Sequence, residues 1–433
     1  MLNAAEIEAY LRTRSLPAIQ ALLPPGEFVM PHYDGLGIAN LPATIAALLG
    51  CELPGACPPL ERGLWASWGE GLKRIVLVIV DALGYLQLQA AMARDDGLVF
   101  HRLVEAGSWV PLTSTFPSTT NNVLTTLWTG YSPAAHGILA YELYLRELAV
   151  AASTLFFWPV SYRKRDALEE WGIEPDRFVP VPGLAEQLAA EGVTTRAFLN
   201  KAYTHSILSR IHNRGVSEVN GFISGGDMWL GLQRTIERYL HEKLLLVTYW
   251  DTIDGITHQY GPGDRTWTHE LRGLSWMLEM GFLSQIKPDQ REGTLLLITA
   301  DHGGIDTPPA SAIHLDDHPA LRDMLSLPPV GETRVPFLHT RGDTLAQAQT
   351  YMRTHLAESF AMLTRKQVMA SGLLGPGPTH AETIHRLGEL VGLARRDRYL
   401  AREERQLKVL GRHGGLSAHE MLVPLIGVRL DAL

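Results

Sequence analysis

Three short apolar segments, at residues 75–80, 244–250 and 295–299, most constrain how this chain can fold. Each consists largely of Ile, Leu and Val and lacks the polar–apolar alternation of a strand with one exposed face. Runs of this length are typical of parallel strands buried on both faces. Because helical patterns separate them, we expect an α/β fold with a doubly wound, mostly parallel sheet flanked by helices.

An acidic residue follows each of these runs. Asp81 follows the run at 75–80, and Asp301 comes just after the run at 295–299. Asp254 comes shortly after the run at 244–250. The carboxyl ends of parallel strands share one edge of a sheet, where ligands of open α/β sheets bind. A single aspartate here could simply cap a helix or shape a turn. Three of them together favour a site on which the carboxylates converge.

Histidines accompany the aspartates. His258 lies four residues after Asp254, so one helical turn would aim both side chains at one point. His302 follows Asp301 directly, and His413 is followed by two glycines. Carboxylate and imidazole are normal zinc ligands, although a turn aspartate and a surface histidine explain the Asp254 pair equally well in isolation. Three carboxylates, three imidazoles and a hydroxyl form a natural set for two metal ions.

A hydroxyl-rich stretch from Thr115 to Gly130 supplies the candidate nucleophile. An extended segment containing a proline runs into an amphipathic pattern that stops at Gly130, which predicts strand, tight turn, helix and C-cap. Thr120 would then lie at the helix N-terminus, where free N–H groups and the helix dipole favour an anion. A hydroxyl that faces a phosphate there is a plausible nucleophile if its pKa is lowered, whereas the alternative is ordinary capping.

Composition excludes several classes of protein. The net charge of −8 gives no reason to expect a nucleic-acid-binding surface. No apolar run approaches the roughly 20 residues that a membrane span needs. The N-terminus lacks the pattern of a signal peptide, and the spacing of the two cysteines, Cys51 and Cys57, indicates no disulfide framework. We therefore expect a cytoplasmic protein that does not bind membranes.

Five separated motifs carry a resemblance to a known family. They are Val80-Asp81-Ala82-Leu83-Gly84, the segment from Thr120 to Gly130 with Pro133 and His136-Gly137-Ile138, the segment from Asp254 to Pro262, Ala300-Asp301-His302-Gly303, and His413-Gly414-Gly415. Together they resemble the alkaline phosphatase superfamily, and most closely its type I phosphodiesterase/nucleotide pyrophosphatase branch, including phosphonoacetate hydrolase-like proteins. The motifs span somewhat under half of the chain. The resemblance implies an alkaline phosphatase-like fold with inserted cap segments.

The resemblance implies a nucleophile. In the family it lies ten residues before the glycine that ends its helix, which is Thr120 if that glycine is Gly130. Thr115 begins a Thr-Phe-Pro tripeptide like that of nucleotide pyrophosphatases, but accepting it would need a five-residue insertion, so it is the second choice. Thr119 is the third.

The resemblance also implies two divalent metal ions, with zinc preferred and manganese possible. By this resemblance one ion is held by Asp254, His258 and His413. The other is held by Asp81, Asp301, His302 and the Thr120 oxygen. His419 competes weakly with His413, but it lacks the flanking glycines.

The substrate contacts depart from the family's pattern. Nucleotide pyrophosphatases place an asparagine 21 residues after the nucleophile, and here that position is Tyr141. Asn121, Asn122 or the Tyr141 hydroxyl could substitute. From residue 103 to residue 145 the chain has no Lys or Arg, and neutral donors suit a singly charged diester better than a dianionic monoester. A cation could still arrive from elsewhere, for example Lys201 or Arg412.

These observations predict a two-metal phosphohydrolase that cleaves phosphodiesters or nucleotide pyrophosphates through a phosphothreonine. The alternatives are a phosphomonoesterase, a phosphonate hydrolase or a phosphomutase on the same core, and a metal-binding pseudoenzyme that works as a binding module. The partner is a small-molecule phosphate ester or nucleotide; the oligomeric state is open. We expect a helical preface at 1–73, a core at 74–330 with a cap at about 150–240, a smaller α+β lid at 331–410 and a return to the core at 411–433.

Overall fold

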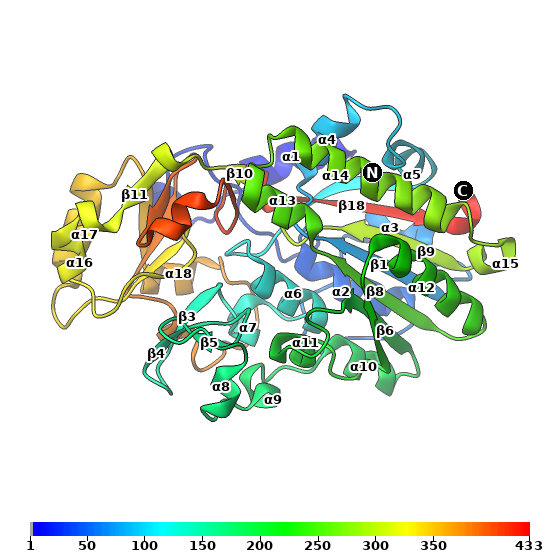
Figure 1. Ribbon diagram of the computed structural model, residues 1–433, viewed down its shortest axis with the longest axis horizontal. Helices are drawn as coiled ribbons and strands as arrows, with labels where there is room; N and C mark the ends of the chain where they lie inside the picture. The colour runs from blue at the N-terminus through cyan, green and yellow to red at the C-terminus, as the bar shows by residue number, and fades with distance from the viewer. Residues whose placement is uncertain (1–2) are drawn as a thin grey trace.

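The computed structural model describes residues 3–433. Two sheets organise the chain, and they lie toward opposite ends of an elongated molecule (Figure 1). The larger sheet and its helices lie on the right of Figure 1, and the second sheet lies on the left. In the described residues no helix is long and apolar enough to cross a membrane.

The larger sheet has seven strands and is mostly parallel, which confirms the expected fold class. Only β18 runs against its neighbours. In spatial order the strands are β2 (Ser108–Thr113), β18 (Leu422–Arg429), β9 (Thr294–Thr299), β1 (Arg74–Val80), β8 (Leu244–Trp250), β6 (Thr194–Asn200) and β7 (Glu218–Phe222).

The three apolar runs form the centre of this sheet. Every residue of β1, β8 and β9 is buried, as their uniform hydrophobicity predicts. Val80 pairs with Trp250, and Ile79 pairs with Thr299. Because the three strands are in register, they end at one level, and the residues that follow them meet at one edge.

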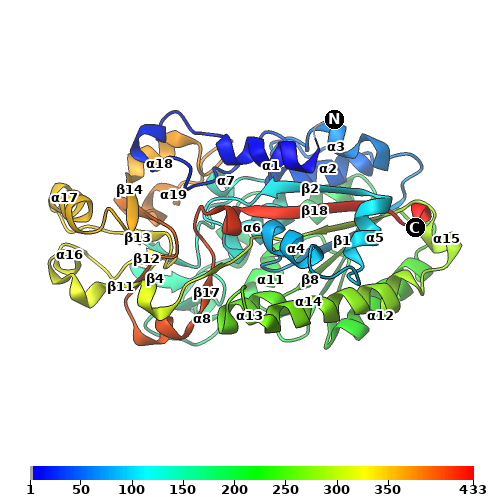
Figure 2. The ribbon, with the colours of Figure 1, turned by 90° about the horizontal axis from the view of Figure 1, so that it is seen from above.

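Helices cover both faces of the larger sheet (Figures 1 and 2). One face carries α12 (Gly225–Arg238), α13 (Thr252–Tyr260) and α14 (Arg265–Leu278). The other carries α6 (Thr120–Thr129), α10 (Leu184–Ala190) and α11 (Ile207–His212). In the N-terminal segment, α1 (Ala4–Thr13) packs on β2, and α2 (Leu41–Leu48) packs on α6.

The second sheet also has seven strands, and all of its pairings are antiparallel. Residues from two distant parts of the chain build it, and a separate hydrophobic core that includes Leu338, Met352 and Phe360 supports it. In order its strands are β14 (Phe360–Thr364), β15 (Leu390–Ala394), β13 (Pro336–Leu338), β12 (Val330–Gly331), β3 (Glu142–Leu145), β4 (Val150–Ser153) and β5 (Trp158–Pro159).

The expected cap at 150–240 differs from the structure. Its first part joins the second sheet through β4 and β5, but residues 184–238 form α10, β6, α11, β7 and α12 of the core. β6 could not be recognised as a core strand from the sequence, because Arg196 interrupts its apolar pattern. The Arg196 guanidinium pairs with Glu218 on β7 and lies over the Tyr239 ring, 3.7 Å from its centroid, so the charge is accommodated inside the fold.

The C-terminal segment brings a loop to the edge of the larger sheet. β17 (Gly411–Arg412) pairs with β10 (Ile305–Asp306), and β18 then runs back through the core. Between them, Gly414 bridges to Ser118, just before α6. The loop that carries His413 therefore lies against the turn that carries Thr120.

Candidate active site

The turns that follow β1 and β9 pack closely against each other. A Cβ atom at Gly303 would lie 2.1 Å from the His419 carbonyl oxygen and 2.9 Å from Gly84 Cα, so only glycine fits there. This contact brings the turn that carries Asp81 against the turn that carries Asp301.

Asp81, Asp301 and His302 form a first group, which we call the inner cluster. Their ligand atoms lie within 4.8 Å of one another, and all three residues are buried. His302 Nε2 lies 3.4 Å from Asp81 Oδ1 and 3.5 Å from Asp301 Oδ2. The Thr120 hydroxyl oxygen is 3.1 Å from the same nitrogen. The hydroxyl therefore shares the space on which the inner cluster converges.

Asp254, His258 and His413 form a second group, the outer cluster. As the sequence predicted, α13 places Asp254 and His258 one turn apart, and His258 Nε2 lies 3.3 Å from Asp254 Oδ2. His413 Nε2 lies 3.9 Å from Asp254 Oδ1. The His413 ring stacks on the His302 ring with centroids 3.8 Å apart, so the two clusters adjoin.

Backbone carbonyls fix the tautomers of all three histidines. The Nδ1 atoms of His302, His258 and His413 lie 2.9, 2.8 and 3.2 Å from the carbonyl oxygens of Gly303, Gly411 and Ser118. A carbonyl only accepts hydrogen bonds, so each Nδ1 carries the proton and each Nε2 offers its lone pair to a cluster. Histidines that bind metal ions are oriented in this way.

The carboxylates keep oxygens free for a cation. Asp81 Oδ2 accepts a hydrogen bond from the Tyr249 hydroxyl, and Asp301 Oδ1 accepts from the backbone N–H of Ala82 and of His302. Among residues 3–433, Asp81 Oδ1, Asp301 Oδ2 and Asp254 Oδ1 are buried without a hydrogen-bond partner. Buried carboxylate oxygens in this state are costly unless a cation compensates them. The two clusters thus fit two metal ions.

Electrostatics agree with this fit. Burial, and then the nearby charges of Asp301 and Asp254, raise the pKa of Asp81 well above its ordinary value. Burial, and then His302 and His258, hold the pKa of His413 well below its ordinary value. Divalent cations between these groups would reverse both effects, because they favour ionised carboxylates and neutral imidazoles.

Of the three candidate threonines, Thr120 is the one beside a cluster. α6 begins at Thr120, its N-cap is Thr119, and it ends at Gly130 with a φ of 82°, as the sequence predicted. The Thr119 hydroxyl hydrogen-bonds Glu332. Thr115 is 1% exposed and lines neither cavity described below.

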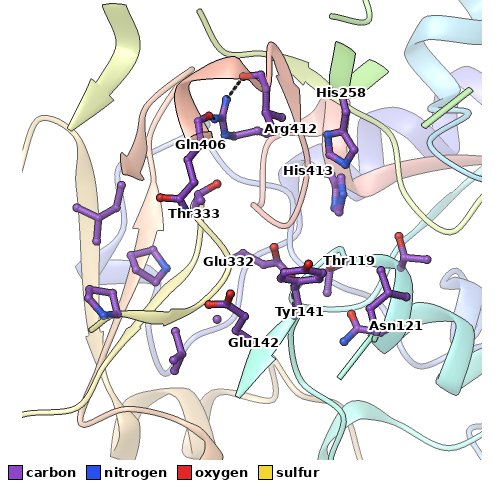
Figure 3. A pocket seen from close by; sticks show the side chains of 18 of the residues that line it. Thr119, Asn121, Tyr141, Glu142, His258, Glu332, Thr333, Gln406, Arg412 and His413 are labelled. Carbon is purple, nitrogen blue, oxygen red and sulfur yellow. Dashed lines mark hydrogen bonds between the residues drawn. The ribbon is translucent and has the colours of Figure 1, made fainter. Parts of the chain in front are cut away.

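Two cavities open on Thr120, one of about 440 Å³ and one of about 310 Å³. The first, which we call the polar arm, reaches toward the second sheet (Figure 3) and is lined by Tyr141, Glu142, Glu332, Arg402 and Arg405, among others. The second, the aromatic arm, is lined by residues that include Trp128, Phe156, Tyr203, Tyr249 and Arg165. Thr120, Asp254, Leu155 and Phe156 line both arms.

The expected substrate contacts are placed differently from one another. Asn122 is fully buried outside both cavities, and its Nδ2 donates to the carbonyls of Pro117 (3.0 Å) and Leu139 (3.2 Å). The Asn122 amide therefore stabilises the turn before α6. It does not contact the cavities, so the predicted role of Asn122 as a substrate contact is wrong. Asn121 lines the polar arm, but its Nδ2 donates to the Ala140 carbonyl at 2.7 Å and to Thr154. Tyr141 lines the polar arm, and its role as a substrate contact stays a prediction.

Sequence reasoning missed the charged residues of both arms. The segment from 103 to 145 has no cation, but the fold brings Arg165, Arg402 and Arg405 to the arms. Arg412 is present too, although its guanidinium donates to Thr307 and to the carbonyls of Val409 and Gln406. Lys201 lines neither arm. None of these arginines stands in a motif, so only the tertiary structure reveals them.

Comparisons with known proteins identify the family and the fold. Residues 75–416 match the family described as type I phosphodiesterase / nucleotide pyrophosphatase. Murine ectonucleotide pyrophosphatase / phosphodiesterase 5 is similar in fold, with 16% identity and a TM-score of 0.59 over 82% of this chain and 89% of that chain. Phosphonoacetate hydrolase from Sinorhizobium meliloti 1021 is also similar, with 16% identity and a TM-score of 0.61 over 84% of this chain and 95% of that chain. No curated protein matches the chain significantly.

Proposed function

The chain belongs to the type I phosphodiesterase/nucleotide pyrophosphatase family and is a phosphoryl hydrolase, and on that premise we propose that it cleaves phosphodiesters or nucleotide pyrophosphates through a phosphothreonine on Thr120. The observation that carries this proposal is the position of the Thr120 hydroxyl. It lies 3.1 Å from His302 Nε2, beside the junction of the two clusters, and lines both arms of the cavity.

Two divalent ions complete this proposal. The inner cluster with the Thr120 oxygen would hold one, and the outer cluster would hold the other. Bound there, divalent cations neutralise phosphoryl oxygens and lower the pKa of a hydroxyl. Imidazole and carboxylate ligands favour zinc, and the share of oxygen ligands is compatible with manganese.

The chain's own residues orient the reacting groups. The substrate phosphate lies at the N-terminus of α6, where free N–H groups favour an anion. Thr120 gives up its hydroxyl proton to solvent, and its Oγ1 attacks phosphorus in line. The bond to the leaving oxygen breaks, and the phosphoryl group stays on the threonine with its remaining substituent. Water then attacks the same phosphorus, the bond to Thr120 Oγ1 breaks, and a proton of that water restores the threonine hydroxyl. Leu155 and Phe156, which line both arms, limit the access of bulk water.

The two arms favour a diester or an anhydride over a monoester. A phosphodiester carries two substituents, and one arm on each side of Thr120 can receive both. A monoester would leave one arm without a substituent. The absence of Lys and Arg from residues 103–145 does not support a preference for diesters, because the fold brings Arg165, Arg402 and Arg405 to the arms.

The test compares bis-(4-nitrophenyl) phosphate with 4-nitrophenyl phosphate at equal zinc or manganese content. We expect the higher kcat/KM for the diester. A monoester preference of about tenfold, or about 1.4 kcal/mol, would contradict the proposal. The screen includes AMP-containing anhydrides and phosphonoacetate, because similar structures hold AMP and phosphonoacetate. A metal-bound protein that cleaves none of these compounds would support the binding-module alternative.

A further inference from the structure

One carboxyl group of the polar arm, that of Glu332, differs from its neighbours because it has no arginine partner among the described residues. Arg402 pairs with Glu142 at 2.5 Å, and the side chains of both are 10% exposed. Arg334 donates to both oxygens of Glu420, at 2.6 and 2.7 Å, in a pair that is fully buried. These bonds commit both arginines. The third carboxyl group, that of Glu332, lines the same arm and has no ion-pair partner within residues 3–433.

The other charged groups near Glu332 are also committed. Arg405 pairs with Glu403 on its own segment, and Arg412 donates to Thr307 and to backbone carbonyls. His413 faces the outer cluster, with Nδ1 toward the Ser118 carbonyl. Several charged or titratable groups surround Glu332. Taken by element, they are Tyr141 and Glu142 before and at the start of β3, Asp254 and His258 in α13, Arg334 before β13, Arg402 and Arg405 after β16 (Tyr399–Ala401), Arg412 and His413 at and after β17, and Glu420 in α20 (Ala418–Met421).

Three neighbouring segments fix the Glu332 side chain. Its Oε1 accepts a hydrogen bond from the Tyr141 backbone N–H at 2.8 Å, and it accepts another from the Thr119 hydroxyl. Behind it, Gly414 has a φ of +103°, and a Cβ atom there would lie 2.8 Å from Glu332 Cγ. The carboxyl group is therefore held between the His413 loop and the residue that precedes Thr120 (Figure 3).

An unpaired carboxylate in this place would repel an anionic substrate. Burial raises the pKa of Glu332 to about 8, against the opposing effect of its bonds from Thr119 and Tyr141, and the charges of Glu142 and Glu420 raise it further. At neutral pH the group is then a neutral acid, which has one O–H to donate. Glu332 and Thr120 line the same arm, so a group bound at Thr120 lies in the cavity that this donor borders.

We propose that Glu332 is a catalytic and specificity-determining residue that donates its carboxylic O–H to an oxygen of the phosphate group bound at Thr120. This inference rests on the proposed function for its substrate. Glu332 lies between β12 and β13 of the second sheet, whereas the other site residues come from the larger sheet and its loops. No sequence motif contains Glu332. It favours substrates whose phosphoryl oxygens are anionic, because the acid donates to them.

The test is the pH dependence of bis-(4-nitrophenyl) phosphate cleavage, with metal content measured at every pH. This diester stays a monoanion through the neutral and alkaline range, so changes in rate belong to the enzyme. Because the active form of Glu332 is protonated, the wild-type kcat/KM should decline as the pH rises through about 8. Glu332→Gln keeps a neutral donor, so this decline should disappear while the neutral-pH kcat/KM stays within a few-fold. Glu332→Leu should lose about tenfold or more at neutral pH.

Glu142→Gln serves as a matched variant in the same arm. It removes one neighbouring negative charge and frees Arg402, so the alkaline decline should move to lower pH without disappearing. An unchanged decline in Glu332→Gln would overturn the inference. The inference would also be overturned if Glu332→Gln and Glu332→Leu lost kcat/KM equally at neutral pH while both unfolded at the wild-type temperature. The ionised carboxylate would then be the active form.

A binding measurement separates this inference from the proposed function. In metal-loaded Thr120→Ala protein, calorimetric binding of bis-(4-nitrophenyl) phosphate should weaken at alkaline pH, and the additional Glu332→Gln change should remove that weakening. If the wild type cleaves no diester but this pattern holds, the proposed function fails and Glu332 remains the anion donor. If cleavage occurs and binding does not depend on residue 332, the inference about Glu332 fails alone.

Discussion

The two clusters use the same residue types but differ in how the fold supports them. In the inner cluster, the side chains of His302 and Asp301 are fully buried and that of Asp81 is 4% exposed. Asp81 follows β1 directly, Asp301 comes two residues after the end of β9, and backbone N–H groups or Tyr249 hold their carboxylates. In the outer cluster, His258 is 38% exposed and Asp254 is 16% exposed, and both line the polar arm.

This difference predicts separate consequences for folding and for chemistry. The inner cluster is part of the core, so its charges affect the free energy of unfolding when no metal ion is bound. The outer cluster borders the polar arm, where water can reach His258, although Asp254 Oδ1 is buried. We therefore expect changes in the inner cluster to alter stability more than changes in the outer cluster, whereas both alter activity.

The largest expected effect comes from Asp301→Asn. Loss of a buried ligand beside Thr120 should lower kcat/KM by about four orders of magnitude. The asparagine can still accept from Ala82 N–H and His302 N–H, and it removes a charge that raises the pKa of Asp81. The metal-free variant should therefore be more stable than the metal-free wild type.

The pH dependence of this gain follows from the raised pKa of Asp81. A raised pKa means that the folded state holds the proton more tightly, so metal-free wild type loses stability as the pH rises above the ordinary aspartate range. The stabilisation by Asp301→Asn should consequently be larger at neutral pH than at acid pH. Thermal unfolding of chelator-treated proteins measures it, and a variant that is less stable at neutral pH would refute the role given to the buried charges.

Changes in the outer cluster should have the next largest effect. Asp254→Ala or His413→Ala should cost several kcal/mol of transition-state stabilisation, because the ion they hold would be lost or displaced. The unfolding free energy of the metal-free protein should change less for Asp254→Ala than for Asp301→Asn, since the Asp254 side chain borders the cavity. Kinetics with added zinc and metal-free unfolding curves check both parts. Near-normal rates in both variants would contradict the assignment of this metal site.

The smallest effect that separates the clusters is the order in which metal ions leave. All three residues of the outer cluster line the polar arm, whereas Asp81 is the one residue of the inner cluster that lines a cavity, the aromatic arm, so a chelator reaches the outer cluster more readily. We expect one ion per chain to leave in a fast phase and the second in a slower phase, and activity to fall with the first. Elemental analysis at timed intervals follows both ions. Simultaneous loss would remove the distinction between an inner and an outer ion.

The sequence predicted the larger sheet well where local pattern and tertiary role agree. The runs that became β1, β8 and β9 are buried along their whole length, so their composition alone identifies them. The spacing of Asp254 and His258 is likewise local, because α13 is a regular helix. In each case a few adjacent residues contain the necessary information.

The polar arm could not be predicted in this way. Glu332 touches Tyr141, 191 residues earlier in the chain, through a strand pairing in which β12 has only two residues. Such a short strand has no periodicity to detect. Arg165 and Arg402 also reach the site through long-range packing, and Arg196 hid a core strand because its charge is paired only in the folded state. Long-range contacts, rather than composition, decide these positions.

The most direct test is to trap the phosphoryl group on the enzyme. Acid quenching of the zinc-loaded protein during bis-(4-nitrophenyl) phosphate turnover, followed by peptide mass spectrometry, should find the 4-nitrophenyl phosphoryl group on Thr120. Thr120→Ala should abolish turnover and the adduct while metal content and fold persist, and Thr115→Ala should retain substantial activity. An adduct on Thr115 or Thr119, or an active Thr120→Ala protein, would contradict the placement of the nucleophile beside the inner cluster.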